Sequence, residues 1–347
     1  MRERWCSFDC LKGLACAAVV LIHYNFDGDL GIAVKAFCRF GVPVFFMISG
    51  FFFLTDEGMN EVIVIKKIRH ILRILFAAGI FYGIFTILFN IIVDKEWNLY
   101  EFIIKHITAG KIVKFFISND PFIYSHLWFL MALVYCYSFS LILFEKNKNL
   151  SWSKILAPLL LFCYSLLQEF GRLLDIQRSV PIPEVEEHVY LFNIFIFRAL
   201  PFFLFGVVLR IYKPIVEKIP ISSTVLFVFA LSGGICAIFE RFFIDESQFF
   251  IGTYITVAAL FILSIRERTY NNKALAYIGR ELSLYIYVLH IAIGKGLDFA
   301  FQKLNIIERH IYASGRGVII LCSSIFIAAI INAFKKKILQ STVDLNA

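Results

Sequence analysis

Residues 8–26 read FDCLKGLACAAVVLIHYNF, and after a short polar interval residues 39–54 read RFGVPVFFMISGFFFL. Both runs are apolar and long enough to cross a bilayer as helices. Each run nevertheless carries ionisable residues, because Lys12 and His23 lie in the first and Arg39 heads the second. Charged groups are costly in hydrocarbon, so they normally face a protein interior or a watery cavity. The two runs therefore predict a polar site inside a membrane protein.

Lys12 and His23 are predicted to share one face of the first helix. They are eleven residues apart, a spacing that returns to within roughly 20° of the same face, about 16 Å along the axis. One stripe of this helix then presents a cation near one membrane surface and an imidazole near the other.

The composition of the whole chain supports a membrane protein. Its 347 residues are 60% apolar, with a mean hydropathy of +0.78, whereas soluble domains are about half apolar. Forty residues are Phe, and only 17% are charged. The formal net charge of +8 does not indicate a nucleic-acid partner, because the cations lie in short clusters between apolar runs, as expected for a protein in contact with membrane lipid.

The apolar runs predict an all-α integral membrane protein, a bundle of about ten transmembrane helices that forms a single domain over residues 1–347. The spans are placed at 8–25, 40–54, 72–93, 123–144, 154–168, 189–211, 221–240, 249–265, 281–296 and 314–334. Alternate connections are rich in Lys and Arg, which places those connections in the cytoplasm. An even number of spans then puts both termini in the cytoplasm, and the basic stretch from Lys335 to Lys337 agrees.

Two of the connections on the outer side are long. Residues 94–122 mix aromatic, apolar and basic side chains, and they predict either a solvated connector or a helix lying on the outer membrane surface. Residues 169–188 are acidic and contain proline, and they predict a solvated connector.

Several polar residues of different spans are predicted at a similar depth, in the outer half of the membrane. They are three histidines and two arginines, with aromatic neighbours, and they comprise His23, Arg39, His126, Trp128, Arg198, Tyr287 and His290. A single histidine at a helix end is usually structural or interfacial. Three histidines and two arginines at one depth favour a functional site.

The opening of the chain is similar to that of the acyltransferase 3 family. The family pattern is D-x-x-(R/K)-G-x-A with a following histidine, then R-x-x-V-P-x-F-F-x-x-S-G. It is carried here by Asp9, Lys12, Gly13, Ala15, His23, Arg39, Val42, Pro43, Phe45, Phe46, Ser49 and Gly50. The family usually has Arg at the position of Lys12, and Lys keeps the charge without the planar fork of donors. Pro43 and Gly50 are interpreted as structural, as a bend and a point of close packing. HLWFL around Trp128 and the runs that contain Arg198 and His290 extend the resemblance over essentially the whole chain.

The resemblance implies an O-acyltransferase of the bacterial inner membrane. Such an enzyme moves an acyl group, by default acetyl from acetyl-CoA, to a hydroxyl of a lipid-linked or polymeric surface sugar on the outer side. His23 is the expected catalytic residue, either as the base that takes the hydroxyl proton or as a covalent acyl acceptor, and Lys12 and Asp9 join it in the catalytic set. The residues expected to position the sugar or stabilise charge are Arg39, His126, Trp128, Arg198, Tyr287 and His290.

The third span opens with a cluster of cations, KKIRHILR at residues 66–73. From charge alone, the cluster is explained by membrane topology. The resemblance implies a second role, in which Lys67, Arg69 and Arg73 bind the phosphates of acyl-CoA. The chain has no GxSxG elbow, P-loop, HExxH or zinc-type spacing. Acyl-CoA is therefore the only donor proposed, and no metal is expected.

Two other functions fit parts of the same pattern. A transporter or exporter of sugar-lipids also needs polar residues inside a helical bundle. A structural partner in a polysaccharide-synthesis complex needs no indispensable intramembrane residue. Turnover separates them, because an enzyme consumes acyl-CoA in detergent whereas a transporter needs a sealed vesicle.

Overall fold

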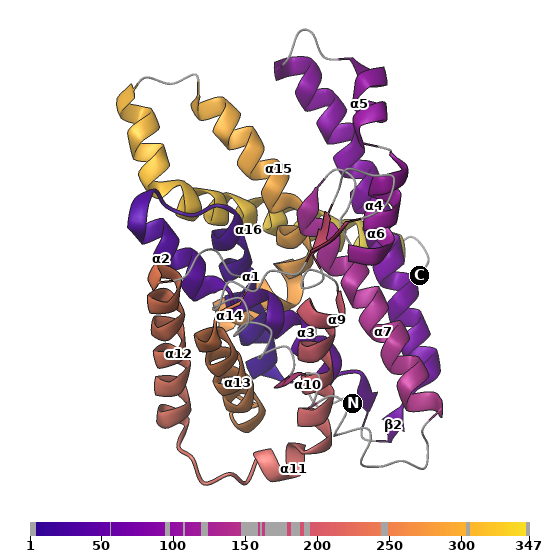
Figure 1. Cartoon of the computed structure of the whole chain (residues 1–347), viewed down its shortest axis with the longest axis vertical. Helices are drawn as coiled ribbons and strands as arrows, with labels where there is room; N and C mark the ends of the chain where they lie inside the picture. Colours follow the sequence, from indigo (N-terminus) through magenta and orange to yellow (C-terminus); the bar gives the residue numbers. More distant parts are fainter. Residues whose placement is uncertain are drawn as a thin grey trace. The chain divides into compact units, whose positions relative to one another are not determined.

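The protein is α-helical throughout nearly all of its described residues (Figure 1). The computed structural model describes residues 5–55, 57–93, 98–106, 108–118, 124–146, 159, 162–163, 179–181, 188–190, 195–243, 249–302 and 306–344. Within these ranges, strands occur only as two short antiparallel pairs. These are β1 (Leu54–Thr55) with β2 (Gly58–Met59), and β3 (Ser179–Pro181) with β4 (His188–Tyr190).

Seven helical segments of the described residues are long and apolar enough to cross a membrane, which makes this an all-α membrane protein. They are Cys6–His23, Gly28–Phe51, Glu61–Val93, Ser125–Phe144, Ser223–Phe243, Lys273–Phe301 and Ile311–Ile338, with shorter apolar helices at Leu200–Ile211 and Ile251–Arg266. Most of the span predicted at 154–168 lies outside the described residues. The count of ten spans and the cytoplasmic position of both termini stay predictions.

The chain divides into two compact units. Unit 1 comprises Met1–Phe45 with Lys213–Ala347, and unit 2 comprises Phe46–Tyr212. The single domain over residues 1–347 stays a prediction.

Unit 1 is built around α1 (Cys6–His23). It also contains α2 (Gly28–Cys38), α11 (Lys213–Val216), α12 (Ser223–Phe243), α13 (Ile251–Arg266), α14 (Lys273–Tyr277), the π-helical turn η3 (Ile278–Leu282), α15 (Ser283–Phe301) and α16 (Ile306–Asp344). Helices α12 and α13 lie side by side (Figure 1). Glu240 of α12 caps α13, because its carboxylate accepts hydrogen bonds from the backbone N–H groups of Ile251 and Gly252 at 2.7 and 2.9 Å.

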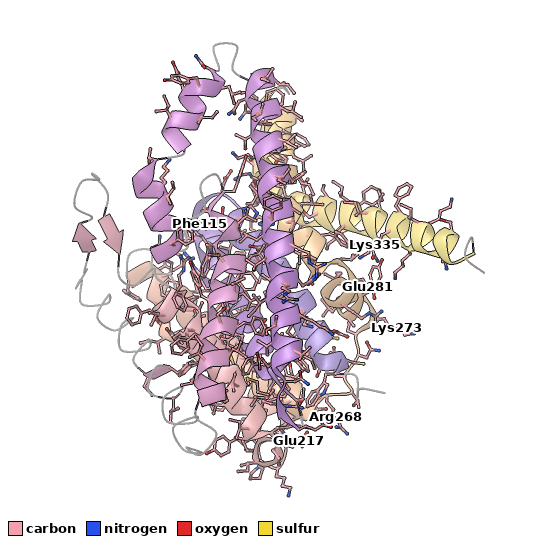
Figure 2. The ribbon with its side chains drawn as sticks, turned by 90° about the vertical axis from the view of Figure 1, so that its right-hand side faces the viewer. Phe115, Glu217, Arg268, Lys273, Glu281 and Lys335 are labelled. Carbon is pink, nitrogen blue, oxygen red and sulfur yellow. The ribbon has the colours of Figure 1, made fainter. Side chains whose placement is uncertain are left out.

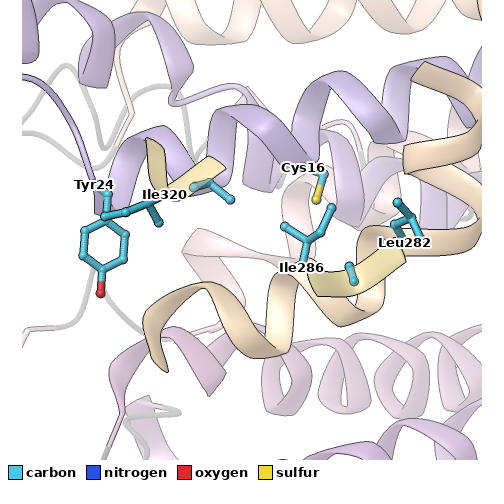
Figure 3. Close-up of a cluster of buried hydrophobic side chains, with 7 residues drawn as sticks. Cys16, Tyr24, Leu282, Ile286 and Ile320 are labelled. Atoms are coloured by element: carbon cyan, nitrogen blue, oxygen red, sulfur yellow. The ribbon is translucent and has the colours of Figure 1, made fainter. Parts of the chain in front are cut away.

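A buried apolar cluster joins three helices of unit 1 (Figure 3). Its members are Cys16, Val20 and Tyr24 at α1, Leu282 and Ile286 at η3 and α15, and Ile320 and Ala328 of α16. At the other end of α16, Lys336 forms an ion pair with Glu281 at 3.0 Å, and Figure 2 shows Glu281 near Lys335. The apolar core joins α1, α15 and α16, and the ion pair joins η3 to α16.

Unit 2 contains the end of α3 (Gly41–Phe51), α4 (Glu61–Val93), α5 (Leu99–His106), α6 (Ala109–Ser118), η1 (Ser125–Leu127), α7 (Trp128–Lys146), α9 (Phe195–Arg198) and α10 (Leu200–Ile211). Helices α3 and α10 approach closely through two glycines. A Cβ added to Gly50 would overlap the carbonyl oxygen of Phe203, and one added to Gly206 would overlap that of Met47. The close packing predicted for Gly50 is therefore confirmed.

The second span differs from its prediction. The sequence predicts a polar interval at residues 27–38, but Gly28–Cys38 form α2, and the apolar segment runs to Phe51. Arg39 therefore does not head the second span, since it lies between α2 and α3, inside a 24-residue segment. The break at this point has a physical cause, because Pro43 in the first turn of α3 has no N–H to donate to the carbonyl of Arg39.

The two long connections are described in part. Residues 94–122 contain the helices α5 and α6, which confirms helical structure there, whereas their position on the outer membrane surface stays a prediction. Most of 169–188 lies outside the described residues.

Candidate functional site

Asp9 and Lys12 lie where α1 touches the backbone of α14 and η3. A Cβ added to Gly13 would overlap the carbonyl oxygen of Leu275, and one added to Gly279 would overlap that of Asp9. The Lys12 ammonium lies 4.0 Å from the Asp9 carboxylate, with both side chains only partly exposed. The turn that faces them is a π-helix, a geometry that often occurs at functional sites.

His23 and His290 lie together in unit 1. Their ring centroids are 5.2 Å apart, and they come from the last residue of α1 and the middle of α15. His290 is 0% exposed, whereas His23 is exposed. The convergence of these two histidines, predicted from their depth in separate spans, is therefore present within this unit.

The backbone of α15 fixes the imidazole of His290. Its Nδ1 lies 3.0 Å from the carbonyl oxygen of Ile286 and 2.9 Å from that of Tyr287. Carbonyl oxygens only accept hydrogen bonds, so Nδ1 carries the proton, and in the neutral ring Nε2 keeps its lone pair. The ring of Tyr287 lies 6.5 Å from that of His290, which adds a partly buried phenol to the pair.

Arg39 occupies another junction of unit 1. It caps α2, where its backbone N–H donates to the carbonyl of Ala36 at 3.2 Å, and its side chain is partly buried. It is positioned by the break between α2 and α3.

Trp128 and Arg198 form a cation–π pair in unit 2. The Arg198 guanidinium lies 4.1 Å from the Trp128 ring, which also packs on Phe46 at 5.8 Å. Arg198 is the last residue of α9, and Trp128 is the first residue of α7. Because the guanidinium covers one face of the indole, a sugar could stack on Trp128 only from the other face or after Arg198 has moved.

His126 lies in an aromatic cluster of the same unit. It is 4% exposed, and its ring lies 5.0 Å from that of Tyr82 and 6.1 Å from that of Tyr124. Thr86 donates to the Tyr82 carbonyl at 2.7 Å and lies 3.4 Å from the Tyr124 hydroxyl. The tyrosines were missed from sequence, where a tyrosine in an apolar run has no distinguishing signal.

The cations of α4 separate into two kinds. The Lys67 ammonium donates to the carbonyl of Phe52 at 2.7 Å and lies 5.4 Å from the Tyr137 ring. Arg69 and Arg73 are exposed, and Nε of Arg73 donates to the Arg69 carbonyl at 3.3 Å. The two arginines are therefore accessible on one face of the helix, whereas Lys67 is held against its own unit.

An additional polar cluster of unit 1 was not predicted. Its members are Tyr24, Asp298, Tyr312 and Arg316, which lie near the end of α1 and on α15 and α16. Asp298 and Arg316 had a usable signal, since charged residues inside apolar runs indicate buried pairs or sites.

Comparison with known families identifies nearly the whole chain. A family model described as an acyltransferase domain matches residues 6–333, a range that includes every residue of the candidate site. Searches of curated proteins and of solved structures found no similar protein.

Proposed function

The chain belongs to the acyltransferase 3 family, and from this premise we propose that it is a membrane O-acyltransferase of the bacterial inner membrane. Its donor is cytoplasmic acyl-CoA, acetyl-CoA by default, and its acceptor is a hydroxyl of a lipid-linked or polymeric surface sugar. The contact between His23 and His290, at 5.2 Å between ring centroids, is the observation that carries the proposal. It joins the histidine of the family's opening motif to a second imidazole within an apolar bundle.

His23 is proposed as the general base. It takes the proton of the sugar hydroxyl while that oxygen attacks the thioester carbonyl, and the tetrahedral intermediate then collapses with loss of the CoA thiolate. The thiolate receives the proton from the imidazolium, which returns His23 to its neutral form. In the covalent alternative, a ring nitrogen of His23 attacks the thioester carbonyl and the CoA thiolate leaves. The sugar hydroxyl then attacks the acyl-imidazole, which releases His23, and the hydroxyl proton neutralises the thiolate. Its exposure makes the ring accessible to substrate in either case.

The remaining residues of unit 1 are assigned by their chemistry. His290 has its Nδ1 proton held by backbone carbonyls, and its Nε2 is proposed as the acceptor that orients a hydroxyl or the neighbouring imidazole. Arg39 and Tyr287 are donors that can hold an oxygen on which negative charge develops. Lys12, about 16 Å along α1 from His23, is proposed to lie where acyl-CoA enters from the cytoplasm. Asp9 lies within 4.0 Å of Lys12 and orients its ammonium.

The residues of unit 2 are assigned to binding. Arg69 and Arg73 are exposed one helical turn apart and form the proposed binding site for the CoA phosphates. Lys67 holds α4 against the Phe52 carbonyl. His126, Trp128 and Arg198 are proposed to bind the sugar.

The test is consumption of acyl-CoA by the purified protein in detergent, with and without added glycan. Removing a general base lowers the rate by about 10²–10⁴-fold, so His23→Ala and His23→Gln should lose turnover by that factor. The matched control is Leu14→Ala, because Leu14 is exposed on the same helix.

Two results would contradict the proposal. Wild-type turnover in both His23 variants would exclude His23 as base or acyl acceptor. A wild-type protein that consumes no acyl-CoA with any of a broad panel of acceptors would favour transport, and a flux assay in sealed vesicles would then test that function.

A further inference from the structure

Tyr24 directly follows His23 and anchors the end of α1. It is 5% exposed, and its hydroxyl donates to the carbonyl of Ile291 on α15 at 2.9 Å. Figure 3 shows the ring beyond Ile320 at the edge of the apolar cluster. Tyr24 is the C-cap of α1, and its backbone N–H donates to the carbonyl of Val20 at 2.9 Å. The position of Tyr24 therefore determines where the last residue of the helix lies.

Two glycines make the space that Tyr24 occupies. A Cβ added to Gly294 of α15 would overlap the Tyr24 ring, and one added to Gly317 of α16 would lie 2.7 Å from the Tyr24 carbonyl oxygen. Neighbouring glycines do not have this role. A Cβ on Gly296 would meet nothing within 4 Å, and one on Gly315 would meet only Ile319 of its own helix, at 3.4 Å or more.

A partly exposed ion pair completes the surroundings of Tyr24, which we call the Tyr24 seat and which consist of Gly294, Gly317, Asp298 and Arg316. The Arg316 guanidinium lies 4.9 Å from the Tyr24 ring. Arg316 binds Asp298 in a bidentate way, with Nε to Oδ1 at 2.9 Å and Nη2 to Oδ2 at 2.6 Å, and the Tyr312 hydroxyl donates to the same carboxylate at 2.7 Å. A bidentate pair fixes the plane of the guanidinium, and a cation above a tyrosine ring attracts it. The contacts thus run from Asp298 through Arg316 to Tyr24.

We propose that Asp298 and Arg316, acting through Tyr24, are positioning residues that hold His23 against His290. The inference rests on the proposed function of His23. Helix α15 carries His290, the Ile291 carbonyl, Gly294 and Asp298, so one helix sets the place of both imidazoles. A displacement of about 1 Å at a reacting group can cost about 10²-fold in rate, and a loosened seat allows such a displacement.

The first test compares two alanine substitutions on one helix. Gly294→Ala should lower kcat by at least about 10-fold, with an unchanged KM for acyl-CoA, because it displaces the Tyr24 ring. Gly296→Ala is the matched control and should keep wild-type kcat. Equal kcat in the two variants would contradict the proposal.

Milder variants keep the test decisive if Gly294→Ala does not fold. Tyr24→Phe removes the hydrogen bond to Ile291, and Arg316→Lys keeps the charge but loses the bidentate geometry. Both should lower kcat at constant KM, and Arg316→Lys should retain more activity than Arg316→Ala. Unchanged kcat in Tyr24→Phe and in Arg316→Lys would overturn the positioning role.

A second readout does not depend on activity. Diethyl pyrocarbonate acylates accessible imidazoles, and mass spectrometry can compare the rate at His23 with that at His70, which is exposed on α4. Loss of the seat should raise the His23 rate relative to His70, since the ring leaves its contact with His290. A relative rate equal to wild type in Tyr24→Phe and Arg316→Lys would contradict the proposal.

The two readouts separate this inference from the proposed function. A wild-type protein without turnover whose His23 labelling responds to the seat variants would overturn the acyltransferase assignment and keep the seat. An active protein in which neither kcat nor labelling responds would overturn the seat alone.

Discussion

At the scale of single residues, the pair of Arg198 and Trp128 makes a measurable prediction. Arg198→Ala removes a cation 4.1 Å from the indole ring, and we expect the unfolding free energy to fall by about 1–2 kcal/mol. Thermal unfolding in detergent, followed by the exposure of buried thiols such as that of Cys136, measures the change. Arg73→Ala is the control, because Arg73 is exposed on α4 and should leave stability within about 0.5 kcal/mol. An equal effect of the two substitutions would show that the ring contact contributes nothing.

For single residues, the sequence was informative where a polar or charged side chain lies in an otherwise apolar run. A histidine near the end of an apolar run stands out, and His23 and His290 do lie together. Arg316 and Asp298 stand out in the same way, but only the structure shows that they pair with each other and reach Tyr24. Which side chains come into contact depends on how separate helices pack, and the local sequence around each residue does not contain that information. Tyr24 itself has no such signal, since a tyrosine in an apolar run is ordinary.

At the scale of helices, the contact between α1 and the α14–η3 segment predicts which glycines are essential. Gly279→Ala would place a methyl group against the backbone at Asp9, and overpacking of this kind typically costs about 1–3 kcal/mol. Gly83→Ala on α4 meets nothing within 4 Å. That control should be neutral or slightly stabilising, because alanine favours helix by about 1 kcal/mol over glycine. Thermal unfolding of the two variants in detergent tests the contrast, and a stable Gly279→Ala protein would refute the close contact.

Helices were predictable wherever an apolar run was long, and α1, α7, α12 and α13 fall close to their predicted spans. Helix α4 ends at Val93 as predicted but begins at Glu61, well before the predicted start at residue 72. The helix α2 was missed because Asp27 and Asp29 made its start appear to be a polar connection. Tertiary packing stabilises α2 as a helix, since Ala36 is buried in a cluster with Ala237 and Phe250 of neighbouring segments. Tertiary burial of this kind lies outside what a local pattern reports.

At the scale of the whole molecule, topology is the property that the charge pattern predicts. The end of α16 is basic, with Lys336 paired to Glu281 at 3.0 Å and Lys335 lying 5.9 Å from the Tyr285 ring. Lys and Arg next to apolar spans favour the cytoplasmic side. We therefore expect reporters fused to either terminus to be cytoplasmic, as an even number of spans requires. A reporter that is active only outside the cytoplasm should be silent at both ends, and activity at one end alone would show that the number of spans is odd.

The three lysines at the end of the last span also predict that its orientation in the membrane depends on their charge. Replacing Lys335, Lys336 and Lys337 by Gln removes three cations next to this apolar helix and breaks the ion pair with Glu281. Because each cation near a span biases its orientation, a fraction of the C-terminal reporters should then become exposed on the outer side. The control replaces Lys111, which lies on α6 in a connection predicted outside, and should leave the reporter in the cytoplasm. An unchanged reporter in the triple variant would mean that packing of α16 against α1 and α15, rather than its terminal charge, determines the orientation of the last span.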